Sequence, residues 1–148
     1  MDNFLDSTTV DVVLTSYMKI KNNPAKPTEA QLDVLNVLWE RGALTVRQVH
    51  EELSRSKPTQ YTTTLKIMQV MANRGLVTRD ESERSHVYHA HIKREDAQRQ
   101  IASDLMNRVF AGSVRRLLVS ALGTKRASLK EIDELQAFLD ECRQRTKR

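Results

Sequence analysis

Two capping boxes mark the starts of helices in the middle of this 148-residue chain. Residues 28–31 (TEAQ) and 45–48 (TVRQ) both place a glutamine three residues after a threonine. At that spacing the two side chains cap each other's backbone N–H groups, which is a signal for a helix N-terminus. Apolar residues at helical spacing follow each box, so the sequence predicts two helices, the first of which ends at Gly42.

The stretch PTQYTTTLK, residues 58–66, opens a third predicted helix. Pro58 suits the first position of a helix and Gly75 suits the left-handed residue after its end, so we predict a helix from Pro58 to about Arg74. Three consecutive threonines oppose this prediction, because each β-branched side chain costs about 0.5 kcal/mol relative to alanine in a helix. Either the segment is not helical or these side chains face something that offsets the cost.

The two faces of this segment favour the helix. At 3.6 residues per turn, one stripe is apolar and is expected to pack on the first two helices, and the opposite face is polar, with Thr64 on the flank beside the apolar stripe. The apolar stripe consists of Tyr61, Leu65, Met68 and Ala72, and the polar face of Thr59, Thr62, Thr63, Lys66 and Asn73.

Two short alternating runs, LVTRD and HVYHAHI, flank the polar tip ESERS and predict a β-hairpin. On the second run, Tyr88, Ala90 and Ile92 share one face. Three helices followed by a hairpin is the order of a winged helix-turn-helix, whose third helix enters the major groove of DNA. We predict a mainly α protein with a small β-hairpin: a winged helix-turn-helix followed by a C-terminal helical dimerisation region.

The polar face of the third helix has side chains that suit DNA. A threonine hydroxyl bonds a phosphate or a base edge, and its methyl group contacts the thymine methyl. The amide of Gln60 can pair with adenine, and the ammonium of Lys66 with a phosphate or guanine. Basic and hydroxyl side chains lie at the hairpin tip and at the start of the second helix. The predicted DNA-binding residues are Arg47, Thr59, Gln60, Thr62, Thr63, Lys66, Arg84 and Ser85.

Two other interpretations of this face stay open. Threonines near a helix N-terminus also occur on solvated faces, where their hydroxyl groups satisfy loose backbone N–H groups. The basic hairpin tip at Arg84, with Arg79 and His86 nearby, favours DNA over that interpretation. A winged helix can also be a protein-interaction module that does not bind DNA.

The net charge of the chain is +5, from 24 basic and 19 acidic residues. Residues 27–92 contain eight of each sign, whereas residues 93–148 contain 13 basic and 8 acidic residues and so carry the whole excess. A basic protein suggests an anionic partner, but this distribution does not locate a nucleic-acid site. The neutral winged-helix segment keeps the protein-interaction alternative open.

Residues 93–148 carry long apolar stripes at helical spacing but form a unit too small to bury them alone. We therefore predict a homodimer that pairs through this region. Symmetry then predicts a pseudo-palindromic operator on double-stranded DNA, with half-sites about one helical turn apart or a multiple of it. The residues predicted to dimerise are Ile101, Leu105, Val109, Val114, Leu117, Leu118, Leu122, Ile132, Leu135, Phe138 and Leu139.

Patterns for catalysis and metal binding are weak in this chain. His89 and His91 share a strand face but have no neighbouring cysteine, and His86 points the other way, so we favour polar surface histidines over a metal site. The sequence HEEL at His50 lacks the second histidine of a zincin motif. The single Cys142 excludes an internal disulfide and a multi-cysteine zinc site. We expect neither an enzyme nor a bound cofactor.

Residues 1–26 have weak apolar periodicity and a polar end, which predicts a flexible N-terminal arm before the winged helix of residues 27–92 and the dimerisation domain of residues 93–148. No apolar run approaches the roughly 18 residues of a membrane span. The N-terminus also lacks the basic segment of a secretory signal. We therefore expect a cytoplasmic protein with no membrane insertion.

Three stretches of the chain resemble the penicillinase and methicillin-resistance repressor family, the BlaI/MecI group. They are PTEAQLDVLNVLWERGALTVRQVHEEL, YTTTLKIMQVMANRGLVTRDESERSHVYHAHI and VFAGSVRRLL, which cover residues 27 to about 122. The resemblance implies a dimeric winged helix-turn-helix repressor that reads the half-sites of an inverted repeat. It also implies a membrane-bound sensor, often linked to a metalloprotease, that causes the repressor to be cleaved between its two parts.

The resemblance also implies a position for that cleavage. Well-known members are cleaved at an Asn-Phe bond in the first dimerisation helix, and alignment through VFAGS places Asp104 and Leu105 at the corresponding bond. The copper-responsive members use C-terminal cysteine pairs, whereas this chain has Cys142 alone. The bond at Asp104-Leu105 thus departs from the family pattern, and the resemblance does not identify the inducing signal.

Overall fold

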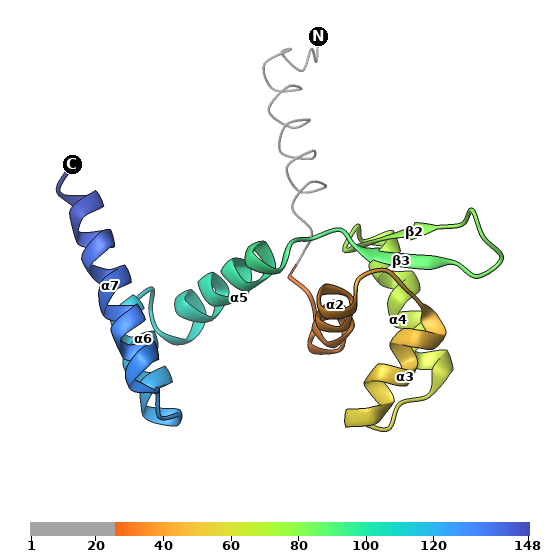
Figure 1. Cartoon of the computed structure of the whole chain (residues 1–148), viewed down its shortest axis with the longest axis horizontal. Coiled ribbons are helices and arrows are strands. Elements are labelled where there is room, and N and C mark those ends of the chain that lie inside the picture. The colour runs from red at the N-terminus through yellow and green to blue at the C-terminus, as the bar shows by residue number, and fades with distance from the viewer. Residues whose placement is uncertain (1–25) are drawn as a thin grey trace, which may run out of the picture. The chain divides into compact units, whose positions relative to one another are not determined.

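The computed structural model describes residues 26–148 (Figure 1), so nearly all of the predicted N-terminal arm lies outside the described residues. The chain forms two compact units, which divide between Ile101 and Ala102. The first contains helices α2 (Glu29–Arg41), α3 (Val46–Ser56) and α4 (Tyr61–Asn73), and strands β1 (Leu44–Thr45), β2 (Val77–Asp80) and β3 (Val87–Ala90). The second contains α6 (Val114–Thr124) and α7 (Leu129–Thr146), and α5 (Arg94–Val109) spans the division.

Both predicted capping boxes are confirmed. The hydroxyl oxygen of Thr28 accepts from the backbone N–H of Gln31 at 3.3 Å, and the Gln31 side chain accepts from the N–H of Thr28 at 3.1 Å. Thr45 and Gln48 make the same reciprocal pair at the start of α3, at 3.3 and 2.9 Å. The starts of α2 and α3 therefore follow from local sequence alone.

The predicted hairpin is confirmed, but the sheet is larger than predicted. β2 and β3 pair antiparallel, and β1 adds to the other edge of β3, which gives the order β1-β3-β2. Leu44 lies opposite Tyr88 in this third strand. β1 could not be predicted from the sequence, because two residues are too few to show the alternation of a strand. Thr45 also serves as the N-cap of α3.

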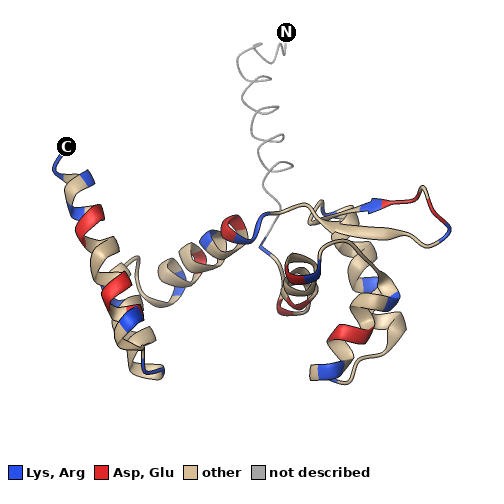
Figure 2. Cartoon of the chain, viewed as in Figure 1, with Lys and Arg blue, Asp and Glu red and all other residues tan. Residues whose placement is uncertain are grey.

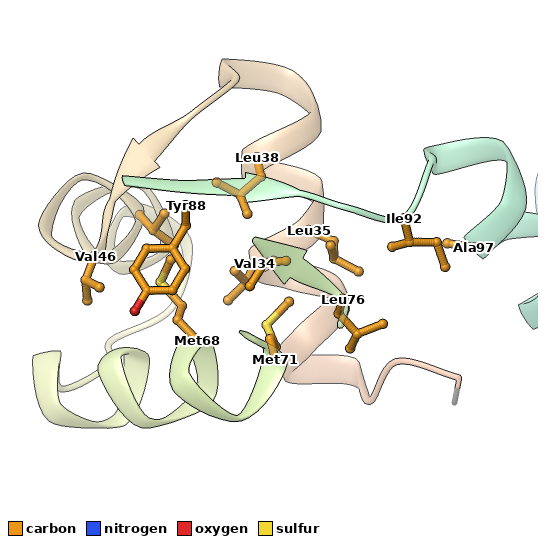
Figure 3. Close-up of a cluster of buried hydrophobic side chains, with 12 residues drawn as sticks. Val34, Leu35, Leu38, Val46, Met68, Met71, Leu76, Tyr88, Ile92 and Ala97 are labelled. Carbon is orange, nitrogen blue, oxygen red and sulfur yellow. The ribbon is translucent and has the colours of Figure 1, made fainter. Parts of the chain in front are cut away.

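One apolar core holds the helices and the sheet of the first unit together (Figure 3). Tyr88 and Ile92, predicted to share one face of the second run, are both buried in it. The buried apolar residues are Val34, Leu35, Leu38, Val46, Val49, Met68, Met71, Leu76, Val77, Tyr88, Ile92 and Ala97. Three helices, a hairpin and a shared core make this unit a winged helix-turn-helix, as the sequence predicts.

The third helix begins later than predicted. α4 starts at Tyr61 and not at Pro58, because Gln60 has an extended backbone with ψ of 144° and serves as its N-cap. The residue before a proline is also biased away from helical geometry, and Lys57 is extended as well. Thr59 and Gln60 thus precede the helix on which they were predicted to lie.

The buried stripe of α4 also differs from the predicted one. Thr64, Met68 and Met71 are fully buried, whereas Tyr61, predicted to lie on the apolar stripe, is 45% exposed. The centre of the buried face is therefore rotated toward Thr64. The polar face survives this correction, since Thr62, Thr63 and Lys66 are all exposed.

α4 ends at the predicted glycine. Gly75 has a φ of 75°, its N–H donates to the carbonyl of Ala72 at 3.2 Å, and the N–H of Leu76 donates to the carbonyl of Met71 at 3.0 Å. These two bonds form a Schellman motif, in which glycine is favoured because it has no Cβ to oppose a positive φ. The motif turns the chain directly from α4 into β2.

Trp39 holds the start of α5 against the first unit. Its indole N–H donates to the carbonyl of Ile92 at 3.0 Å, and the guanidinium of Arg94 lies 5.7 Å from its ring centroid, a cation–π contact. Ala97 is fully buried with the core of the first unit. This packing extends the first unit to Ile101, while the domain boundary drawn after residue 92 stays a prediction.

The second unit has no buried residue between Ala102 and Arg148. The predicted dimerisation residues all lie on α5, α6 and α7, where Ile101, Leu117, Leu118 and Leu135 are half-buried and the others are exposed. Val114 and Phe138, for example, are 65% and 56% exposed. Among the described residues, no helix has the length and apolar character needed to cross a membrane.

Candidate nucleic-acid interface

α4 exposes two of its three consecutive threonines and buries the third. Thr62 and Thr63 lie on the outward face, and their hydroxyl groups have no hydrogen-bond partner within residues 26–148. Lys66 is also exposed on this face and makes no ion pair in that part of the chain. These three side chains are therefore available to an outside partner.

Thr64 is a structural residue. Its hydroxyl oxygen lies 3.3 Å from Nδ1 of His50 on α3, within hydrogen-bond distance. The His50 ring in turn meets the ring of Tyr61 edge to face, with centroids 5.7 Å apart. The cost of this β-branched residue in a helix is thus offset by packing between α3 and α4.

A groove of about 400 Å³ lies between α4 and the start of α2. We call it the α2 groove, and its lining residues are Thr28, Gln31, Thr62, Thr63, Lys66, Ile67 and Val70. Its lining combines hydroxyl groups and an ammonium group with the side chains of Ile67 and Val70, the latter 40% exposed. Such a mixture suits a base-pair edge that presents both a thymine methyl and hydrogen-bonding atoms.

A second groove, of about 650 Å³, lies on the opposite flank of α4, against the wing formed by β2, β3 and their connection. We call it the wing groove. The α4 residues Tyr61, Leu65 and Gln69 form one side of it. Its other lining residues are Thr45, Val46 and Arg47 at the start of α3, and Arg79, Arg84, Ser85, His86 and Tyr88 of the wing. Three guanidinium groups therefore line one groove beside the exposed face of α4.

The wing carries acidic as well as basic side chains (Figure 2). The Arg79 guanidinium forms an ion pair with Glu81. Asp80 accepts a hydrogen bond from the backbone N–H of Ser82 at 2.9 Å, and this bond holds the pKa of Asp80 below its ordinary value. The electrostatic potential in the wing groove therefore depends on where individual charged side chains lie, and not on an excess of basic over acidic residues in the wing.

The structure places the eight predicted DNA-binding residues in three groups. Arg47, Arg84 and Ser85 come together in the wing groove, although they are far apart in the sequence. The second group, Thr62, Thr63 and Lys66, lies in the α2 groove. Thr59 and Gln60 line neither groove. The Thr59 hydroxyl donates to the carbonyl of Lys57 at 3.1 Å, and the Gln60 side chain makes no capping bond.

Sequence reasoning left Gln69 and Arg79 out of the predicted site. Gln69 is exposed on α4 two turns after Thr62. Extending the helical periodicity of the outward face by one more turn would have identified it. Arg79 lies before the hairpin tip, and only the β2–β3 register shows that its side chain reaches the wing groove. The four histidines belong to no metal-binding cluster of three or more His, Cys, Asp or Glu side chains within residues 26–148.

The sequence of the chain matches the family model described as Penicillinase repressor over residues 27–141. This match covers the winged helix and most of the C-terminal helices. The chain belongs to the penicillinase repressor family. The resemblance carried by the LWERG, TVRQV and RGLVTR segments is thereby confirmed.

Named members of the family are repressors. The penicillinase repressor of Staphylococcus aureus is 22% identical over 120 residues, which cover 81% of this chain and 95% of that protein. The penicillinase repressor of Bacillus licheniformis is 24% identical over 120 residues, 81% of this chain and 94% of that protein. A solution structure of monomeric B. licheniformis BlaI in complex with the blaP half-operator is also similar, with 22% identity, a TM-score of 0.45, and coverage of 50% of this chain and 90% of that chain.

Thr64→Val tests the structural role of the buried threonine. The substitution removes the hydroxyl that pairs with His50, so we expect the free energy of unfolding of the full chain to fall by about 1 kcal/mol in urea denaturation. Thr62→Val, at an exposed position, should change it by less than about 0.5 kcal/mol. Equal losses at the two positions would contradict this assignment.

Proposed function

We propose that this chain is a dimeric transcriptional repressor that binds operator DNA through the outward face of α4 and the two grooves beside it. The observation that carries the proposal is the exposed set Thr62, Thr63 and Lys66, whose polar groups have no partner within the described residues. Hydroxyl and ammonium groups on one helix face match the phosphates and base edges of a major groove. No catalytic role is part of the proposal.

Each segment has a separate part in this proposal. α4 enters the major groove, where its threonine hydroxyl and methyl groups contact base edges. Arg47 from α3 and Arg84 from the wing contact the backbone on the wing-groove side. No arginine lies on the outward face of α4 itself, so one winged helix discriminates only modestly between DNA sequences. Much of the affinity then comes from contacts to the DNA phosphates.

The exposed apolar residues of the second unit support a homodimer. Between Ala102 and Arg148 no side chain is buried, yet Val109, Val114 and Phe138 are each more than half exposed. Apolar surface on this scale is typical of a protein interface and not of a free monomer. A second copy of the chain, packed against these helices, would bury it.

A two-fold dimer carries two copies of α4. We therefore propose a pseudo-palindromic operator, with half-sites about one helical turn apart or a multiple of it. Two winged helices that bind together also compensate for the modest sequence discrimination of each copy. Such a protein would work where the chromosome lies, in the cytoplasm of a bacterial cell.

Release of the repressor by proteolysis extends the proposal. The bond between Asp104 and Leu105 lies within α5, where the Asp104 carboxylate accepts from the Arg108 guanidinium at 2.9 Å. Cleavage there would separate the winged helix from α6 and α7 and so break the dimer. A membrane-bound sensor linked to a metalloprotease is the partner that the family resemblance implies. Local opening of α5 would have to precede the cut, because the bond lies inside a helix.

Titration against promoter DNA at several salt concentrations tests the repressor proposal. We expect the association constant to fall steeply with salt, by several logs per log of concentration, because multiple phosphate contacts release counterions. A winged-helix module that binds only proteins would show no tight DNA binding even at low salt. That result would overturn the repressor function.

Thr63→Ala tests the outward face of α4. The substitution removes an exposed hydroxyl and methyl group, so we expect operator binding to weaken by about 1 kcal/mol or more, measured by fluorescence anisotropy. Thermal stability should stay nearly unchanged, since the side chain contacts solvent. Loss of stability with intact binding would show that Thr63 is structural.

Phe138→Glu tests the proposed dimer. Phe138 is 56% exposed on α7, and a carboxylate in a buried interface has a large desolvation cost. We expect the dimer dissociation constant to rise at least tenfold in sedimentation equilibrium. Gln144→Glu makes the same change of charge elsewhere on α7 and serves as the control. A wild-type chain that is monomeric at micromolar concentration would contradict the dimer without contradicting DNA binding.

A further inference from the structure

The three arginines of the wing groove differ in what surrounds them. Arg47 lies on α3 and Arg84 on the connection between β2 and β3, and neither forms an ion pair within the described residues. Arg79 lies on β2, directly opposite the buried Tyr88, and forms an ion pair with Glu81. Arg79 is therefore the groove guanidinium whose position the fold itself determines.

Tyr88 is the cross-strand neighbour of Arg79 on the core side. The β2–β3 register places the two residues directly opposite each other, so their side chains share one face of the sheet. Both side chains line the wing groove, and Tyr88 is fixed in the core with only 1% exposure. The proximity of Tyr88 is the largest cause that raises the pKa of Arg79 above its ordinary value. A guanidinium on a paired strand, beside a buried side chain and already in an ion pair, loses little further freedom on binding an anion.

Glu81 occupies the solvent side of the same guanidinium. It follows Arg79 by two residues, its carboxylate forms the ion pair, and the two side chains are 54% and 37% exposed. Exposed pairs of this kind contribute little to stability, so a competing anion can replace the carboxylate. A phosphodiester is such an anion, because it presents oxygen atoms that accept the same paired N–H bonds from arginine.

We propose that Arg79 is a phosphate-binding residue of the wing groove, and that Glu81 occupies its guanidinium in the free protein until a DNA phosphate displaces the carboxylate. The inference rests on the proposed function, since it concerns the same DNA-binding surface. Glu81 then lowers the affinity for every DNA sequence equally. Contacts from α4 to the bases are left to distinguish an operator from other DNA.

Glu81→Gln is the direct test. The amide keeps the size of the side chain but leaves Arg79 free for phosphate, so we expect a three- to tenfold gain in affinity for random-sequence duplex DNA at moderate salt. The log–log salt slope should become steeper by about one, because binding no longer leaves an unpaired carboxylate that takes up a cation. The position is exposed at the wing tip, so the fold should tolerate the change.

Glu83→Gln is the matched control. It removes the same charge from the same connection, but Glu83 forms no ion pair within the described residues. We expect a gain of less than twofold. Equal gains from the two variants would mean that the wing carboxylates repel DNA by net charge alone, which would overturn the inference.

Arg79→Gln completes a double-mutant cycle. Alone, it should weaken DNA binding with little change in the salt slope, because the phosphate contact of Arg79 and the cation uptake by the displaced Glu81 are lost together. Combined with Glu81→Gln, it should remove the gain that Glu81→Gln produces in the wild-type background, because the guanidinium is gone. A gain that persists without Arg79 would overturn the inference.

The wild-type titration separates failure of this inference from failure of the proposed function. If the wild-type chain binds no DNA at low salt, the repressor function fails. If it binds with a steep salt dependence and Glu81→Gln binds no more tightly, the function stands and the role of Glu81 and Arg79 is overturned.

Discussion

The burial of one face of α4 fixes the rotation of that helix about its axis, and the geometry of the candidate interface depends on this rotation. Met68 and Met71 enter the core, and Thr64 lies against His50 between α3 and α4. A side chain 180° away must then face outward, as Lys66 and Asn73 do. Turning α4 by half a turn would bury the polar face without partners, at several kcal/mol of desolvation cost.

The two units solve the problem of burial differently. The first covers its apolar side chains with three helices and a sheet, and Trp39 adds the start of α5 to that packing. The second leaves large apolar side chains exposed on α6 and α7, although most of the basic excess of the chain lies in it. Charge and proposed function are thus separated: residues 27–92, which form the proposed DNA-binding surface, have no net charge, and their cationic groove arises from the placement of individual side chains. Arg47, Arg79 and Arg84 meet there only because α3 and the wing face the same side of α4.

Elements that depend on neighbouring residues could be predicted well. The capping boxes at Thr28 and Thr45, the Gly75 helix end and the shared face of Tyr88 and Ile92 all follow from spacing of a few residues. The start of α4 could not, because Pro58 is compatible with both a first helical turn and an extended segment. Nor could β1, whose two residues become a strand only by pairing with β3.

The candidate site likewise has features that local sequence determines and features that it does not. The sequence by itself determined the fold class, the family, and the polar face with Thr62, Thr63 and Lys66, because the 3.6-residue period and local capping are properties of the chain. Only the tertiary structure decided that Thr64 packs on His50, that Thr59 and Gln60 precede α4, and that Arg79 joins Arg47 and Arg84 in one groove. The Thr64–His50 contact and the grouping of the three arginines depend on contacts between segments distant in the sequence, and the start of α4 depends on a choice that Pro58 leaves open.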